Sequence, residues 1–324
     1  MATYRQQFLN LLAENERALN AALDDLAVQA GGMVAQAADP VTGKVPVERQ
    51  NELLQRVTGL ILAFYLSTPS LLALVSGSDG RVRPLSPFLR LLWPVMRQAA
   101  SLATEQQAAF LRRQLTGQPE LLARLGTARF PASSEQGKNA ASPGGVAFLN
   151  QFAPPHLFVR ADGKVLEERV RLAAVDHSTR TTGFLREQFA AGAVVAGIAL
   201  ALRAFFKPGG GGTARTVAIS RTEPVFAWGL AQRDGAIFNP FVRQAVVRRS
   251  HKGAHPCPIC DPLVGTYPAD DYPVPGFHPN CVCRVDFVTT RDVSSARRWL
   301  TGSGAVNVRG PLSPQFLDDL MGGE

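Results

Sequence analysis

The sequence predicts a mainly α-helical protein with a small α+β C-terminal part, and three observations support this fold class. Apolar residues recur at helical spacing through the first third of the 324-residue chain. Residues 126–156 lack this periodicity, and all four cysteines follow much later, beside short runs rich in β-branched residues. The composition, with 46% hydrophobic and 19% charged residues, excludes a collagen, a coiled-coil rod or a wholly disordered chain, and the length favours two packed units.

Three helices are expected in an N-terminal bundle spanning residues 1–125. The first ends at Asp39-Pro40 and the second at Ser67-Thr68-Pro69. The third begins at Ser86-Pro87, where serine caps and proline suits the first helical position, and Pro94 is expected to kink it. The apolar stripes that would pack the bundle are Phe8, Leu11, Leu12, Leu19, Ala22, Leu23 and Leu26; Leu53, Leu54, Val57, Leu60, Ile61 and Phe64; and Phe88, Leu91, Leu92, Val95 and Met96.

Residues 126–156 are rich in Pro, Ser, Gly, Ala and Asn, which predicts a linker, or an arm that orders against a neighbour in an assembly. A second domain is expected over residues 157–290, starting with a short strand at Leu157-Phe158-Val159, and a C-terminal tail over residues 291–324.

A long helix is predicted from about Val165 to Phe206. Phe189 to Leu202 contains no polar side chain, yet at ~1.5 Å per residue it spans about 21 Å, short of the ~30 Å core of a bilayer. We therefore expect a buried helix in a close helix-helix contact and no stable membrane association, the alternative being a segment that meets a membrane at a later stage. Gly209 to Gly212 then reverses the chain, and Thr222 is expected to cap a new helix through about Gln232, with Pro224 in its first turn.

Short strands are predicted at Val246 to Arg249 and Val282 to Val288, on either side of the cysteine cluster. Cys257-Pro-Ile-Cys260 is followed by His278-Pro-Asn-Cys281-Val-Cys283, and two such pairs of ligands can close a tetrahedral metal site. The preferred set is Cys257, Cys260 and His278 with one of Cys281 or Cys283. A structural zinc ion is expected, so the chain reads as an N-terminal helical bundle, long helices and then a zinc-knuckle-like segment with short strands.

Other readings of the cluster are less favoured. A disulfide pair is disfavoured because the first six residues lack the apolar core of a secretion signal, so we expect a protein that stays in the cytosol where it is made. Pro256-Cys257-Pro-Ile-Cys260 matches half of the zinc deaminase signature, but the upstream H-x-E half is missing. Neither the zincin nor the nucleophile-elbow, Walker or dinucleotide-binding motif occurs, and Asp176-His177-Ser178 is expected to be polar helix surface, so no enzyme is predicted.

The net charge of +8 is concentrated in one sector of the sequence. Between Gly197 and Cys260 there are nine Lys and Arg residues against two acidic ones, a pattern typical of polyanion contact or of a solvated basic face. Arg215, Arg243, Arg248 and Arg249 are expected to face phosphate or, as the resemblance described below implies, an acidic ring of the portal.

The last half of the chain resembles the phage head morphogenesis, or minor head protein, family that includes Mu F-like proteins. The resemblance covers roughly Leu166 to Val288. It lies in an Ala/Gly-rich helix and a turn, Ala214-Arg215-Thr216 through Arg221-Thr222-Glu223, and then Cys257-Pro-Ile-Cys260, Gly265 and His278-Pro-Asn-Cys281-Val-Cys283-Arg284. Two positions depart from the family pattern: Val282 stands where Arg is frequent, and Pro224 falls in a helix that usually continues.

This resemblance implies a minor capsid protein of a tailed bacteriophage that acts in head assembly, DNA packaging or ejection. Its implied partners are the portal protein, capsid proteins and non-specifically bound packaged DNA, and its implied location is the capsid interior near the portal, after assembly in the host cytoplasm. Two other classes remain as alternatives: a zinc-dependent hydrolase or deaminase, which needs an open metal position and a nearby carboxylate such as Glu223, and a DNA-binding regulator built on a zinc module.

Overall fold

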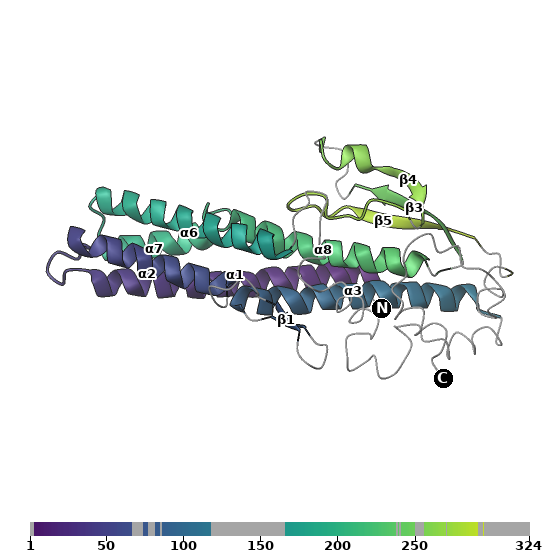
Figure 1. The fold of residues 1–324 in the computed structure, drawn as a ribbon, viewed down its shortest axis with the longest axis horizontal. Helices are drawn as coiled ribbons and strands as arrows, with labels where there is room; N and C mark the ends of the chain where they lie inside the picture. The colour runs from purple at the N-terminus through teal and green to yellow at the C-terminus, as the bar shows by residue number, and fades with distance from the viewer. Residues whose placement is uncertain are drawn as a thin grey trace. The chain divides into compact units, whose positions relative to one another are not determined.

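The computed structural model describes residues 3–66, 74–76, 82–84, 86–117, 166–237, 239, 241–249, 256–269, 271–290 and 294. These residues form a mainly helical protein with a three-stranded antiparallel sheet near the C-terminus, as the fold class predicted (Figure 1). The helices are α1 (Tyr4–Ala37), α2 (Val47–Tyr65), α3 (Pro87–Gln114), α6 (Leu166–Ala190), α7 (Val195–Phe206) and α8 (Ala214–Ile237). The strands are β1 (Leu74–Ser76), β2 (Val82–Pro84), β3 (Val242–Arg248), β4 (Gly265–Pro268) and β5 (Arg284–Thr289).

The chain divides into two compact units. The helical unit contains Asn10–Val95 and Phe152–Arg221, and the sheet unit contains Met1–Leu9, Met96–Gln151 and Thr222–Glu324. The predicted linker at 126–156, the strand at Leu157-Phe158-Val159 and nearly all of the predicted tail at 291–324 lie outside the described residues. The predicted division into 1–125 and 157–290 therefore stays a prediction.

In the helical unit, most of the stripe residues predicted between Leu11 and Leu92 are buried in the core. Leu19, Leu23, Leu53 and Ile61 are among its fully buried side chains, and α2 packs along α6 (Figure 1). The predicted helix limits agree with the structure: α1 ends before Asp39, whose Oδ1 accepts the N–H groups of Val41 and Thr42. Ser86 Oγ accepts the Leu89 N–H at 3.2 Å and caps α3. β1 and β2 pair antiparallel in the same unit.

The predicted single helix from Val165 to Phe206 is wrong, because the chain forms α6 and α7 with a turn between them. Gly192 adopts φ +69°, a conformation that glycine accepts without steric cost, and the Val195 N–H donates to Gly43 O. A run of apolar residues does not indicate where a helix ends, so the sequence analysis predicted one helix where the structure has two. The predicted burial is also only partly right: Ile198 and Leu202 are buried, but Leu200 is 72% exposed.

The close helix contact expected for this segment is present. A side-chain carbon placed at Gly31 of α1 would lie 3.3 Å from Ala199 Cβ of α7, so glycine and alanine together let the two backbones approach. None of the described helices is both long and apolar enough to span a bilayer.

The predicted new helix at Thr222 is also wrong, because α8 runs through Pro224 without a break. A proline inside a helix removes the N–H that would bond the carbonyl four residues earlier, here that of Ser220. Asn15 Nδ2 donates to Ser220 O at 2.9 Å, and Asn15 is buried. A side chain distant in sequence thus satisfies the carbonyl group that Pro224 cannot, which the local sequence does not reveal.

The small sheet has the order β4-β3-β5, with both pairs antiparallel. The strands predicted at 246–249 and 282–288 are present as parts of β3 and β5, although β5 begins at Arg284. Ala245 pairs with Phe287 and Val247 with Val285, so these four side chains share one face. That face packs with the cysteines, Tyr272 and Phe277 in one buried cluster.

Candidate metal centre

The first half of the candidate site is a tight turn that begins at Cys257. The Cys257 N–H donates to the Asp261 carboxylate at 2.8 Å, and the Asp261 N–H donates back to Cys257 O at 2.9 Å. The Cys260 N–H points at Cys257 Sγ at 3.4 Å. Arg249 pairs with Asp261 at 2.9 Å, which anchors the turn to the end of β3. This geometry aims both sulfurs to the same side, as two thiolate ligands of one ion require.

The second half is the turn from His278 to Cys283, just before β5. The Cys281 N–H donates to His278 O at 3.0 Å, and Asn280 takes the left-handed conformation with φ 62°. The Asn280 N–H donates to Thr222 Oγ1 of α8 at 2.9 Å. Helix α8 therefore holds this turn directly, through the central residue of Arg221-Thr222-Glu223.

Two glycines bring the same region close to α8. A side-chain carbon at Gly229 would lie 2.7 Å from Val274 Cγ1, and one at Gly276, where φ is +106°, would lie 3.1 Å from Phe226 Cβ. Larger residues at either position would push the 271–283 loop away from the helix.

The five predicted ligands come together as two overlapping groups that can hold a metal ion. One group is Cys257, Cys260 and His278, the other is Cys260, Cys281 and Cys283, and within each the ligand atoms lie within 4.8 Å of one another. His278 Nε2 is 3.3 Å from Cys257 Sγ and 3.0 Å from Cys260 Sγ. Cys260 Sγ is 3.9 Å from Cys281 Sγ and 3.5 Å from Cys283 Sγ. Cys260 belongs to both groups, and the choice between Cys281 and Cys283 stays a prediction.

The imidazole of His278 has the tautomer that a metal ligand needs. Its Nδ1 lies 2.7 Å from Pro279 O, and because a carbonyl oxygen can only accept, Nδ1 carries the proton. The Nε2 lone pair is then free to face the sulfurs. A backbone carbonyl that orients the second ring nitrogen is a common feature of histidine ligands.

The thiols differ in how readily they ionise. A hydrogen bond from the Cys283 thiol, with backbone N–H groups of Cys283 and Gly276, lowers the pKa of Cys281 to about 4. Backbone N–H groups of Cys260 and Ile259 lower the pKa of Cys257. Burial and then the negative charge of Cys281 raise the pKa of Cys260 to about 12. A bound cation would remove this conflict by compensating several adjacent thiolates at once.

The zinc-enzyme alternative requires a carboxylate near the metal ligands. Among the described residues, no carboxylate joins either group of ligand atoms, and Glu223 is fully buried on α8. His251 and His255 lie outside the described residues.

The prediction that Asp176-His177-Ser178 is polar surface is wrong for two of its three residues. His177 is 1% exposed and Ser178 is buried as well. His177 Nδ1 is 2.9 Å from the hydroxyl of Tyr65, which in turn contacts Thr216 Oγ1, whereas Asp176 pairs with Arg180. Adjacent helical residues do point in different directions, but in α6 the side chain of His177 points into the core.

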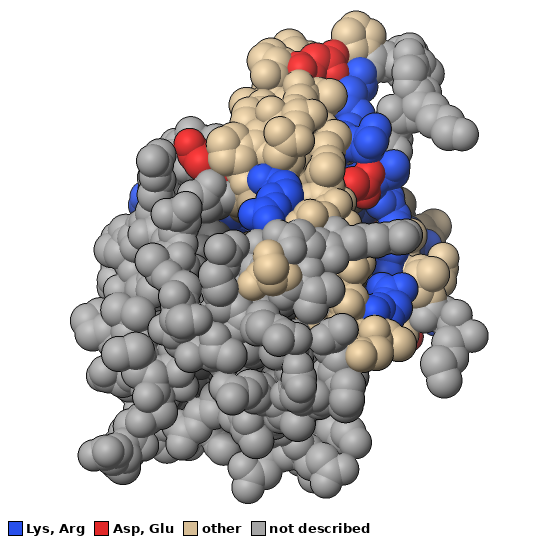
Figure 2. Space-filling view, turned by 90° about the vertical axis from the view of Figure 1, so that its right-hand side faces the viewer, with Lys and Arg blue, Asp and Glu red and all other residues tan. Residues whose placement is uncertain are grey.

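The predicted polyanion-binding arginines have different surroundings. Arg215 is exposed on α8 in the helical unit, and Arg243 and Arg248 are exposed on β3 in the sheet unit. Arg248 pairs with Asp286 at 2.7 Å, and Arg249 holds the cysteine turn through Asp261. Figure 2 shows Lys and Arg side chains in a column along one edge of the face in view, with acidic side chains between them. Contact of these arginines with a polyanion stays a prediction.

Sequence reasoning missed the role that several residues have at this centre, chiefly Asp261, Gly229 and Thr222, which was named only as a helix cap and as part of Arg221-Thr222-Glu223. Asp261 directly follows Cys260, and because aspartate often forms turns, its role in the cysteine turn could have been predicted from the sequence. Thr222 and Gly229 gave no such signal, because their partners lie 58 and 45 residues further along the chain. In comparisons with known proteins, no family model, curated protein or solved structure matches this chain significantly.

Proposed function

We propose that this chain is a minor head protein of a tailed bacteriophage, similar to the Mu F-like head morphogenesis family. One observation carries the proposal: two of the motifs on which the resemblance rests are in contact. Thr222 of Arg221-Thr222-Glu223 accepts the hydrogen bond of Asn280 from His278-Pro-Asn-Cys281. Contact between two motifs that are far apart in sequence supports the view that they belong to one structural unit.

The role proposed for the metal is structural, and zinc is the ion that suits the donors. Cysteine sulfurs and an imidazole nitrogen form a soft set that favours zinc over magnesium or calcium. An ion held by Cys257, Cys260, His278 and one further cysteine would fasten the loops on either side of β4 to the sheet. Tyr272 and Phe277 of these loops pack in the small core under the sheet, and ligation would add to the stability that this core supplies.

The proposed partners are packaged DNA and the portal protein, through exposed arginines of the basic sector. Arg215, which is exposed on α8, is the better candidate, because Arg248 and Arg249 already pair with carboxylates in the sheet unit. Contact with phosphate or with an acidic portal surface needs no sequence readout, so the expected DNA binding is non-specific and sensitive to salt.

The test is quantitative mass spectrometry of phage particles purified from the source organism, with the portal and major capsid proteins as internal standards. We expect a few to a few tens of copies of this chain per particle, retained after density-gradient purification. Absence from mature particles and from proheads alike would reject the proposal and favour the regulator or enzyme alternatives.

A further inference from the structure

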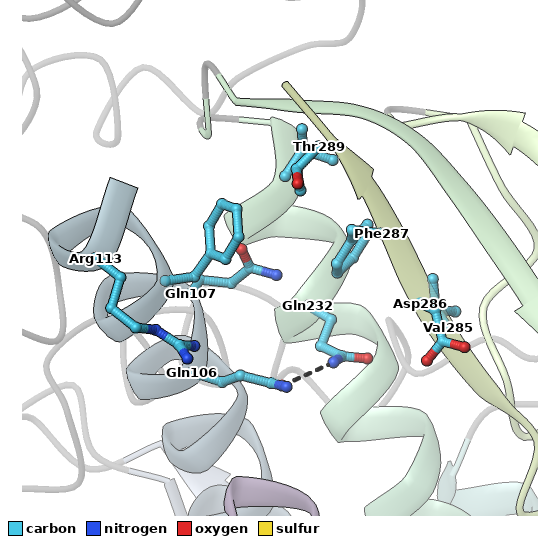
Figure 3. A pocket seen from close by; sticks show the side chains of 10 residues that line it. Gln106, Gln107, Arg113, Gln232, Val285, Asp286, Phe287 and Thr289 are labelled. Carbon is cyan, nitrogen blue, oxygen red and sulfur yellow. Dashed lines mark hydrogen bonds between the residues drawn. The ribbon is translucent and has the colours of Figure 1, made fainter. Parts of the chain in front are cut away.

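The sheet unit contains a pocket of about 230 Å³ that neither the metal centre nor the proposed function uses (Figure 3). It lies between α3, α8 and β5. Its lining residues are Gln106, Gln107, Phe110, Arg113, Gln232, Val242, Val285, Asp286, Phe287 and Thr289. Figure 3 shows Gln106, Gln107 and Arg113 on one side and Phe287 and Thr289 on the other.

The pocket follows the edge of β5 and not one face of the sheet. Val285 and Phe287 point to the buried face, whereas Asp286 between them points to the opposite one, and all three line the pocket. Among the described strands, β5 is an edge strand that pairs only with β3. Open strand edges attract other chains, and natural proteins usually cover them.

Amide groups with unused hydrogen-bonding capacity lie in the pocket wall. Gln232 Nε2 donates to Gln106 Oε1 at 3.0 Å, and Asn239 Nδ2 donates to Gln107 Oε1 at 3.2 Å. The amide nitrogens of Gln106 and Gln107 and the amide oxygen of Gln232 have no further partner in the part of the chain that the structure describes. They offer donors and an acceptor suited to the main chain of a peptide.

The charges around the pocket favour an acidic peptide. Asp286 is its one acidic lining residue, and Arg248 and Arg284 already contact that carboxylate at 2.7 and 3.5 Å. Arg113 is exposed at the pocket wall. The net charge around the pocket is therefore positive. The phenyl rings of Phe110 and Phe287 add apolar surface.

We propose that residues 311–324 of the same chain dock in this pocket and cover the open edge of β5. This segment contains Asp318, Asp319 and Glu324 and no Lys or Arg, in a chain of net charge +8. The same segment has five large apolar residues, Leu312, Phe316, Leu317, Leu320 and Met321. The side chain of Thr289 lines the pocket, so the remainder of the chain leaves β5 next to the proposed site, and the 20 residues from 291 to 310 are ample to return to it.

Site-specific photocrosslinking of the full-length protein tests this proposal. With p-benzoylphenylalanine in place of Phe316, we expect crosslinks from residues 311–324 to the α3 segment 106–113 or to β5, within one chain. Arg113→Glu should reduce the crosslink yield at least threefold, and combining it with Asp318→Arg and Asp319→Arg should restore the yield. Arg17→Glu, the same change of charge on an exposed residue of α1, should leave the yield unaltered.

Mixing isotopically light and heavy protein separates docking within one chain from docking between copies. Crosslinks that join light to heavy chains, crosslinks confined to the helical unit, or a yield indifferent to Arg113→Glu would each overturn the proposal.

Discussion

Single side chains settle two features of the helical unit that local sequence rules mispredict. Asn15 supplies the hydrogen bond that Pro224 cannot, and so α8 continues where a helix end was expected. His177 occupies the inward position of α6, between the hydroxyl of Tyr65 and the ring of Phe206. Both are buried polar groups, for which the loss of one partner is costly.

Asn15→Leu should lower the free energy of unfolding by about 1–3 kcal/mol, because it leaves the Ser220 carbonyl buried without a donor. In a Pro224→Ala background, the helix N–H at position 224 can bond that carbonyl, so the same substitution should cost less. Urea unfolding of the four proteins measures the coupling. Equal costs in the two backgrounds would show that Asn15 acts through packing alone.

The protein should lose stability as the pH falls from about 7 to 4, and His177 should account for part of the loss. Burial lowers the pKa of His177 to about 4, although the charge of Asp176 opposes this shift. Since the pKa is lowered on folding, the unfolded chain binds the proton more readily, and the stabilisation present above pH 6.5 is lost between pH 6.5 and 4. One proton over this range corresponds to about 3 kcal/mol.

Thermal unfolding of the wild type and of His177→Gln at pH 7.5 and 5 measures this contribution. The glutamine variant retains a polar group for Tyr65 but does not titrate, so its transition should move less between the two pH values. An equal movement in both proteins would assign the acid sensitivity to other groups.

At the scale of elements, the metal centre joins two turns, one helix and one sheet. The first turn is held by Asp261 and the second by Thr222, so the ligands are positioned from both sides of β4. Cys260 belongs to both ligand groups, whereas each of the other four candidates belongs to one, so we expect Cys260 to be a ligand whichever group holds the ion.

Purified protein should contain about one zinc ion per chain by inductively coupled plasma mass spectrometry. Among single Cys→Ser variants, Cys260→Ser should retain the least metal, and one of Cys281→Ser and Cys283→Ser should retain nearly as much as the wild type. That pair of variants identifies the fourth ligand. Hydrogen exchange after chelation should rise in β3, β4 and β5 and stay unchanged in α2, whereas a uniform rise would contradict a local structural role.

Thr222→Val should weaken metal retention about 10-fold or more, because the Asn280 N–H loses its acceptor and the His278 turn is no longer held by α8. Thr222→Ser keeps the hydroxyl and is the matched control. The rate of zinc transfer to a chromogenic chelator compares the two. Identical rates would mean that α8 does not restrain the ligand turn.

At the scale of the whole molecule, the positive charge is unevenly distributed and partly compensated. The basic sector of the sequence includes Arg248 and Arg249, yet both pair with carboxylates, so only part of the sector is available to a polyanion. Charge counted along the sequence therefore overstates the charge that a partner would meet.

Duplex DNA of unrelated sequences should bind with similar affinity, and binding should weaken steeply with salt. Arg215→Ala should reduce the slope of log K against log salt by about 1, whereas Arg248→Ala should change it less. Fluorescence anisotropy over a salt series provides the measurement. A strong preference for one sequence would favour the regulator alternative instead.

The three N-terminal helices, parts of β3 and β5 and the residues of the cysteine cluster could be predicted from the sequence, because capping residues, apolar spacing and ligand spacing are all visible along the chain. Asp39-Pro40 located the end of α1, Ser86-Pro87 located the start of α3, and the spacing of the cysteines and His278 located all five ligand candidates. The break between α6 and α7 was missed because an apolar run reads the same whether a helix continues or turns back. The continuation of α8 was missed because the group that permits it is more than two hundred residues away.

What only the tertiary structure decided is which polar groups find partners. Thr222 meeting Asn280, Asn15 meeting Ser220, Arg249 meeting Asp261 and His177 meeting Tyr65 all join segments that the sequence does not relate. A hydrophobic face needs only apolar contact, so it can be recognised from the regular spacing of apolar residues along the sequence. A buried hydrogen bond needs one donor and one acceptor at about 3 Å, and only the folded chain determines which two groups meet.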